Sequence, residues 1–78
     1  PNPATSNVTI QYDLNGRTAV NDARIVITSL VGNKVYTQPI NNNSGKASID
    51  ISNLVAGIYF YSIEVNGQAI STKKLIVK

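Results

Sequence analysis

The chain has 78 residues, room for one small domain, and seven Lys and Arg against four Asp and Glu give it a net charge of +3. It contains no Cys and no His, which excludes a disulfide framework, a thiolate nucleophile and the usual general base near neutral pH. The four carboxylates (Asp13, Asp22, Asp50 and Glu64) are scattered, so we expect no metal site, no catalytic residue and no cofactor, and a protein that is not an enzyme.

The first half of the chain predicts three strands. Eight Val, ten Ile and six Thr are β-branched and fit a pleated surface better than a helix. Apolar and polar residues alternate in three runs, residues 8–14, 23–30 and 34–38. Asn15-Gly16 and Gly32-Asn33 supply turns between these runs. Pro39 ends the third run or confines it to a sheet edge.

The second half of the chain predicts three further strands. After a polar loop at residues 41–45, residues 46–52 alternate, with Ala47, Ile49 and Ile51 facing inward. Residues 57–65 form the most apolar run, and both of its faces are expected to be at least partly covered. Asn66-Gly67 is a strong signal for a two-residue hairpin that leads into the last run, residues 68–77.

These patterns predict an all-β protein, an immunoglobulin-like antiparallel β-sandwich of about seven strands. We expect a single domain over residues 1–78, with 1–7 as a linker or lead-in and 8–78 as the sandwich. Leu54, Gly57 and Tyr59 are interpreted as the corner where the chain crosses between sheets. Gly57 would permit the bend, and the Tyr59 hydroxyl would bond to an upstream backbone group.

Composition also bears on partners and location. The basic residues Arg17, Arg24, Lys34 and Lys46 lie far apart, so the sequence predicts no nucleic-acid binding. No apolar run approaches the roughly 20 residues that a spanning helix needs, so no transmembrane segment is expected. The chain is rich in neutral polar residues, with ten Asn, seven Ser and six Thr, and in this its composition resembles that of extracellular bacterial β-domains.

The two ends of the chain each allow two interpretations. Pro1-Asn2-Pro3 fixes two φ angles and suits a stiff spacer after a preceding domain, or an ordinary linker. At the other end, Lys73 and Lys74 precede Leu75-Ile76-Val77 and a last Lys78. This segment is either a final strand whose lysines guard a sheet edge, or a recognition strand that a partner reads by strand addition.

In this order, the segments resemble a known family. They are Pro1-Asn2-Pro3-Ala4, residues 30–35 around Gly32, residues 54–59 with Leu54, Gly57 and Tyr59, the Asn66-Gly67 hairpin, and Lys73-Lys74-Leu75-Ile76-Val77-Lys78. The chain resembles, over essentially all 78 residues, the type A C-terminal sorting domain of the type IX secretion system of Bacteroidetes. Position 33 is Asn where that family often has Gln or Lys.

The resemblance implies a function in export. Similar domains end secreted cargo proteins, fold as immunoglobulin-like sandwiches, and direct the cargo from the periplasm through the outer-membrane translocon. A sortase-like peptidase usually removes the domain, and the cargo is released or joined to lipopolysaccharide at the cell surface. Carried over to this sequence, the translocon would read Lys73, Lys74, Leu75, Ile76, Val77 and Lys78, while Gly57 and Tyr59 support the fold.

Two alternatives remain open from the residues alone. A carbohydrate-binding or adhesive β-sandwich of a surface protein would use Tyr12, Tyr36, Tyr59 or Tyr61 to stack on sugars. Tyr59, Phe60 and Tyr61 are consecutive, however, so Phe60 points away from its neighbours and the three do not form one flat platform. An inert spacer is the second alternative.

Overall fold

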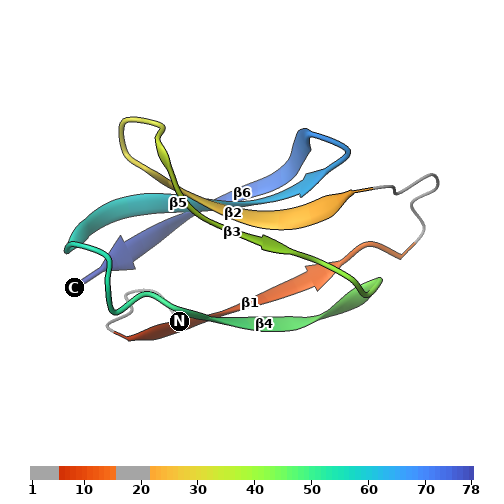
Figure 1. Ribbon diagram of the computed structural model, residues 1–78, viewed down its shortest axis with the longest axis horizontal. Coiled ribbons are helices and arrows are strands. Elements are labelled where there is room, and N and C mark those ends of the chain that lie inside the picture. The colour runs from red at the N-terminus through yellow and green to blue at the C-terminus, as the bar shows by residue number, and fades with distance from the viewer. Residues whose placement is uncertain (1–5, 16–21) are drawn as a thin grey trace.

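Six strands form two antiparallel sheets in the part of the chain that this computed structural model describes, residues 6–15 and 22–78 (Figure 1). The strands are β1 Asn7–Asp13, β2 Ala23–Ser29, β3 Lys34–Pro39, β4 Ser44–Asp50, β5 Gly57–Val65 and β6 Gln68–Val77. One sheet pairs β1 with β4, and the other has the order β3-β2-β5-β6. Pro1, Asn2, Pro3 and Gly16, on which the predicted lead-in and first turn depend, lie outside the described residues.

The all-β prediction is confirmed, but the predicted number of strands is wrong. The described residues hold six strands rather than about seven, because each alternating run gives one strand and the segments between them are turns and loops. Strand β4 begins at Ser44, two residues before the predicted run, since Gly45 already pairs with Tyr12 of β1. The immunoglobulin-like topology stays a prediction.

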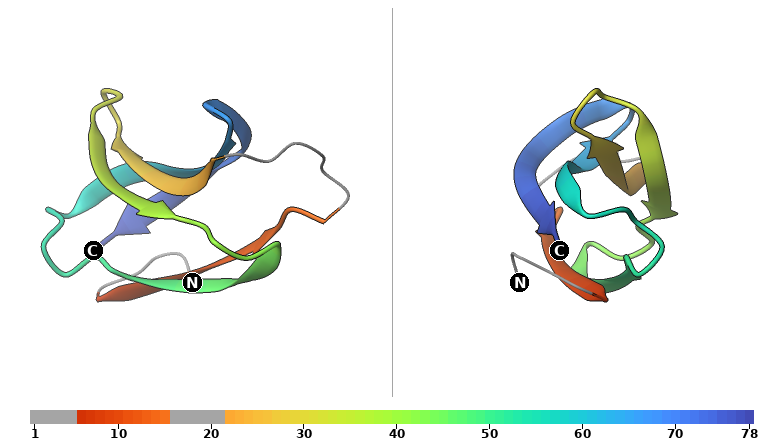
Figure 2. Two further views of the ribbon diagram at one scale, coloured as in Figure 1. Left: turned by 45° about the vertical axis from the view of Figure 1, so that its right-hand side comes forward. Right: turned by 90° about the vertical axis from the view of Figure 1, so that its left-hand side faces the viewer.

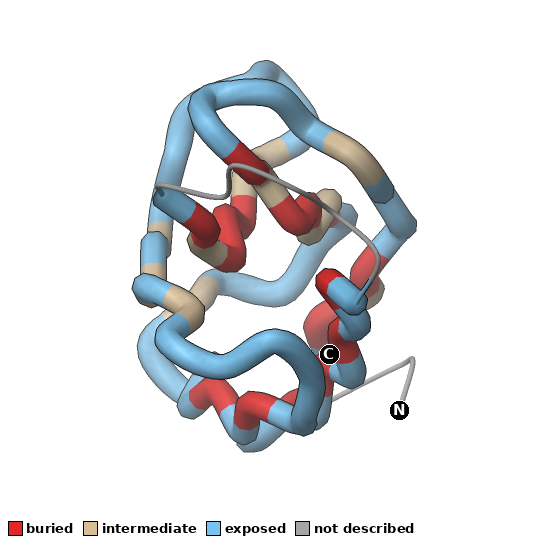
Figure 3. The backbone as a smooth tube through the Cα atoms, turned by 90° about the vertical axis from the view of Figure 1, so that its right-hand side faces the viewer, coloured by how far each residue is buried: buried red, intermediate tan, exposed pale blue. Residues whose placement is uncertain are grey.

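The two sheets enclose the core between their inner faces, as the buried segments in Figure 3 show. The alternation in β1 places every second side chain inward, and β4 does the same with Ala47 and Ile49. The largest fully buried side chains come from both sheets, and each contributes about 1.5–3 kcal/mol by leaving water. They are Ile10, Ile25, Val26, Ile27, Ile49, Ile51 and Leu75.

Val26 is buried on the outer face of its sheet. Ile25 and Ile27 point into the core as the pattern predicts, and Val26 lies on the opposite face with Arg24 and Thr28. It is nevertheless only 1% exposed. Its neighbours across the sheet are Thr37 of β3 and Ser62 of β5, so the centre of the sheet shields it from both sides.

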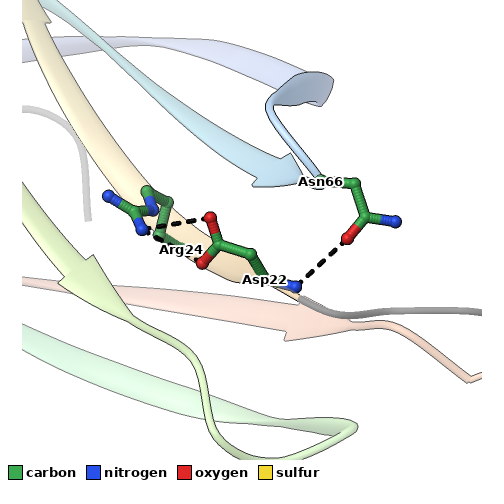
Figure 4. A network of polar contacts seen from close by, with 3 residues as sticks. All are labelled: Asp22, Arg24 and Asn66. Atoms are coloured by element: carbon green, nitrogen blue, oxygen red, sulfur yellow. Dashed lines mark hydrogen bonds and ion pairs between the residues drawn. The ribbon is translucent and has the colours of Figure 1, made fainter.

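A polar network ties the start of β2 to the β5–β6 hairpin (Figure 4). Arg24 Nη2 donates to both carboxylate oxygens of Asp22, each at 3.0 Å. The Asp22 N–H donates to Asn66 Oδ1 at 3.1 Å, and the Asn66 N–H donates to the Asp22 carbonyl at 2.6 Å. The hairpin itself has positive φ at both central residues, 53° at Asn66 and 85° at Gly67, as a type I′ turn requires.

We expect Gly67→Val to lower the free energy of unfolding by about 1–3 kcal/mol, because a β-branched residue is strained at φ 85°. A Cβ at Gly67 would meet no atom within 4 Å, so the loss would come from the backbone and not from a collision. Urea denaturation measures the change. The control Gln68→Val, at the next and exposed position, should shift stability by less than about 0.5 kcal/mol; equal stability of the two variants would contradict the turn assignment.

Candidate functional site

The predicted recognition segment is split by the fold into anchored and exposed side chains. Leu75 and Val77 of β6 are 0% and 3% exposed and pack in the core, opposite Tyr59 and Gly57 of β5. Lys73, Lys74 and Lys78 are exposed, and Ile76 is half-buried on the other face. A partner can therefore reach the lysines and Ile76, whereas Leu75 and Val77 hold the segment in place.

The predicted corner lies beside this segment. The chain leaves β4 in the two-stranded sheet and enters β5 in the four-stranded sheet, so it does cross between sheets here. Gly57 opens β5 with φ 158° and pairs with Val77, the last residue of β6. An added Cβ at Gly57 would meet no atom within 4 Å, so no packing contact requires glycine at this position.

Tyr59 fastens the loop before β5. The residue is 8% exposed and belongs to the core, and its hydroxyl donates to the Val55 carbonyl at 2.6 Å, the upstream contact that the sequence predicts. The Leu54 N–H donates to the Ile51 carbonyl at 3.0 Å in the same loop. Bonds from the Tyr59 side chain and the Leu54 backbone thus stabilise the corner.

Replacing Tyr59 with Phe should lower the free energy of unfolding by about 0.5–1.5 kcal/mol, since one hydrogen bond is lost and the buried ring stays. Tyr36→Phe is the matched control, because its hydroxyl donates to Gln38 Oε1 on the same strand, at 2.7 Å, and so does not tie a loop to the core. Denaturant titration should show the smaller loss for the control, and a larger loss at Tyr36 would contradict the role assigned to Tyr59.

Asp50 ends β4 at the same corner and is held by Ser52. The Ser52 hydroxyl donates to Asp50 Oδ1 at 2.7 Å, and the Ser52 N–H donates to the same oxygen at 2.9 Å. Both bonds favour the carboxylate, so they hold the pKa of Asp50 below its ordinary value, the hydroxyl having the larger effect. At neutral pH this side chain is a fixed negative charge.

Ser52→Ala should raise the pKa of Asp50 toward its ordinary value, which a carboxyl NMR titration measures directly. A lowered folded-state pKa adds stability above the unfolded-state pKa, and that stability is lost as pH falls through the folded-state value. The stability advantage of the wild type over the variant should therefore shrink on acidification. Ser48→Ala, at an exposed position of β4, should leave the Asp50 titration unchanged, and an identical effect of both variants would contradict this assignment.

The remaining candidate groups do not come together. Tyr12 and Tyr59 are buried, and Tyr36 and Tyr61 are half-buried. Within residues 6–15 and 22–78, no three acidic side chains gather as a metal site needs, and no helix is long and apolar enough to span a membrane. A hollow of about 320 Å³ opens between β3 and β4, lined by Val35, Tyr36, Ile49, Asp50 and Leu54 among others.

The comparison with protein families identifies the chain's relatives. Residues 1–78, the whole chain, match the family described as the secretion system C-terminal sorting domain. The chain belongs to this family. Searches of curated proteins and of solved structures gave no significant match.

Membership of the sorting-domain family confirms the resemblance drawn from the sequence motifs. The family comprises sorting signals for type IX secretion, a process of export toward the cell surface or the medium. The fold brings together two of the family segments, the corner at residues 54–59 and the end of β6, since Tyr59 pairs with Leu75 and Gly57 with Val77. It also exposes Leu30, Val31 and Val55, which the sequence interpretation treated as parts of structural motifs.

Proposed function

We propose that this sorting domain carries an attached cargo protein to the outer-membrane translocon, which recognises the end of β6. The observation that carries the proposal is the family match over residues 1–78. The geometry supports a division of labour within the segment. Leu75 and Val77 anchor the strand in the core, and Lys73, Lys74, Ile76 and Lys78 present side chains to the receptor.

Electrostatic attraction suits this form of recognition. Exposed lysines complement an acidic receptor surface, and such complementarity gives specificity and fast association. The charges cost the domain little, since exposed lysines contribute little to folding stability. Because the recognition residues all belong to this domain and not to the cargo, one small domain of this kind can serve unrelated cargoes.

After export, we propose that a separate sortase-like peptidase removes the domain. The chain has no Cys and no His, so it cannot build a Cys–His or Ser–His nucleophile pair of its own, which is consistent with cleavage by a separate enzyme. The cargo would pass through the periplasm, cross the outer membrane, and remain at the cell surface or enter the medium.

The carbohydrate-binding alternative has less support. Sugar-stacking platforms need exposed aromatic faces, and the four tyrosines are buried or half-buried. Tyr59 also uses its hydroxyl within the protein. Loss of glycan affinity on replacing Tyr36 or Tyr61 would restore this alternative.

A reporter export assay tests the proposal. Residues 1–78 are fused behind a periplasm-directed fluorescent protein in a host with type IX machinery, and fluorescence is measured at the surface and in the medium. Lys73→Glu and, separately, Lys74→Glu should reduce export about fivefold or more, the effect of losing about 1 kcal/mol of attraction. Lys46→Glu, the same charge change at an exposed position of β4, should export normally.

The outcomes separate recognition from folding. Deleting residues 75–78 would remove Leu75 and Val77 from the core, so its effect on export would be confounded with unfolding. The charge reversals avoid this problem, and equal melting temperatures verify it. Normal export of both lysine variants would show that the translocon does not recognise Lys73 and Lys74 through their charge. Periplasmic retention of a folded wild-type fusion would overturn the sorting role.

A further inference from the structure

Strand β4 has one edge that no described strand covers, here called the open edge. On its other side β4 pairs with β1, and within residues 6–15 and 22–78 no strand pairs with the open edge. The Ile51 N–H donates to the Ser6 carbonyl at 2.8 Å, so every second residue of β4 turns its backbone groups toward β1. The backbone groups of Lys46, Ser48 and Asp50 therefore point away from β1, toward the open edge.

Two other sheet edges carry features that discourage pairing with another chain, and β4 lacks these features. Strand β3 ends at Pro39, which has no backbone donor. Strand β6 carries Lys73 and Lys74 and pairs with β5 through a bulge. Strand β4 has no proline, its register with β1 has no bulge, and its single lysine is balanced by Asp50. An edge of this kind is a template for an incoming strand.

The hollow between β3 and β4 lies beside the open edge. It has a volume of about 320 Å³, within the range of ligand pockets, and β3 lies above β4 in both views of Figure 2. Its walls are mainly apolar and include Val35, Tyr36, Ile49, Ile51 and Leu54. A strand added to β4 would turn every second side chain to the same face as Ile49, so the side chain opposite Ile49 would enter the hollow.

Two opposite charges stand on the outer face of β4. Lys46 and Asp50 are both exposed, and the one ion pair among the described residues joins Arg24 to Asp22, so neither charge of β4 is part of an ion pair. Both Ser52 bonds go to Asp50 Oδ1, so Oδ2 can accept from a basic group. Side chains directly opposite one another on one face of a sheet are neighbours, so an added strand can pair both charges. Strand β1 has no basic residue, and its second edge lacks this pattern.

We propose that the open edge of β4 binds an extended segment of a separate protein by strand addition. In the antiparallel orientation of the other strand pairs, the segment reads basic, apolar, any residue, apolar, acidic. Its basic residue lies opposite Asp50, its first apolar residue enters the hollow opposite Ile49, and its acidic residue lies opposite Lys46. Backbone hydrogen bonds supply affinity, whereas the hollow and the two charges supply selectivity.

A single extended segment fits this edge better than a second copy of the domain. A copy paired through its own β4 would bring its β3 to the same face of the joined sheet, where the first β3 already lies above β4. An extended segment needs only the edge and the hollow. The contact is separate from the recognition proposed for the end of β6, because β4 and β6 belong to different sheets.

NMR titration of the 78-residue chain with a capped peptide, Ser-Lys-Ile-Thr-Val-Glu-Ser, tests the proposal. The amide signals of Lys46, Ser48 and Asp50 should shift, and these amides should exchange more slowly with solvent in the complex. A control peptide with the Lys and Glu exchanged should bind at least about tenfold more weakly, because two attractive pairs become repulsive. Replacing the peptide's Ile with Ser should weaken binding severalfold, since no apolar side chain then enters the hollow.

Variants of the domain supply the matched controls. Lys46→Glu should bind the first peptide about fivefold more weakly, whereas Lys73→Glu, the same charge change in the other sheet, should bind it normally. The double variant Lys46→Glu, Asp50→Lys should prefer the control peptide, a reversal of preference that a loss of folding cannot produce. Lys46→Glu should still be exported normally, because the end of β6 is unchanged.

Three results would each overturn the proposal: a wild type that does not bind the first peptide, equal binding of the two peptides, or equal losses from Lys46→Glu and Lys73→Glu. Residues 46–50 of β4 themselves match the proposed pattern. Dimerisation of the domain that blocks the peptide and is lost in Lys46→Glu would therefore overturn the proposal by assigning the open edge to a second copy.

Discussion

The pairing of β6 with β5 is the constraint on which the terminal segment depends. In a strand, neighbouring side chains point to opposite faces, so a slip of one residue would exchange Leu75 and Val77 with Lys74 and Ile76. The observed register sets Leu75 against Tyr59 and Val77 against Gly57, with both side chains in the core. A single strand thereby completes the core and displays two lysines, Lys73 and Lys74, with Lys78 directly after it, and this display requires the domain to be folded.

A β-bulge sets this register. From the hairpin, Val65 pairs with Gln68 and Glu64 with Ala69, but Ile63 then pairs with Ser71, which leaves Ile70 as an extra residue. Without the extra residue, Tyr59 would lie opposite Lys74 and a lysine would face the core. The bulge also explains why Ile70 packs against the second core cluster although it is an odd number of positions from Leu75. Ile70 and Leu75 can therefore both contact the core only because the bulge lies between the two ends of β6.

Most of the fold could be predicted from the sequence because local signals agree with the tertiary structure. Alternation located four strands to within two residues, the apolar run at residues 57–65 located the fifth, and the Asn66-Gly67 turn located the sixth; Pro39 marked the end of β3. The bulge could not be predicted in this way, although the odd spacing of Ile70 and Leu75 is a signal for it. The exposure of Leu30, Val31 and Val55 was not predicted, because strand patterns do not say how far the side chains of a turn or loop project into solvent. Their motifs were interpreted as structural, which holds for Leu54 and Tyr59 but not for these three exposed residues.

The two ends of the domain differ in what they expose. The domain measures 37 Å along its longest axis, with the Asp22–Arg24–Asn66 network at one end and the exposed residues Leu30, Val31 and Val55, in the β2–β3 turn and the β4–β5 loop, at the other. Because the pairing with β5 and the core contacts of Leu75 and Val77 hold β6 in place, the lysines near its end are ordered before any receptor binds them. A segment that folding has already ordered loses less conformational entropy when it binds, which is a physical reason to carry a recognition segment on a strand that also completes the core.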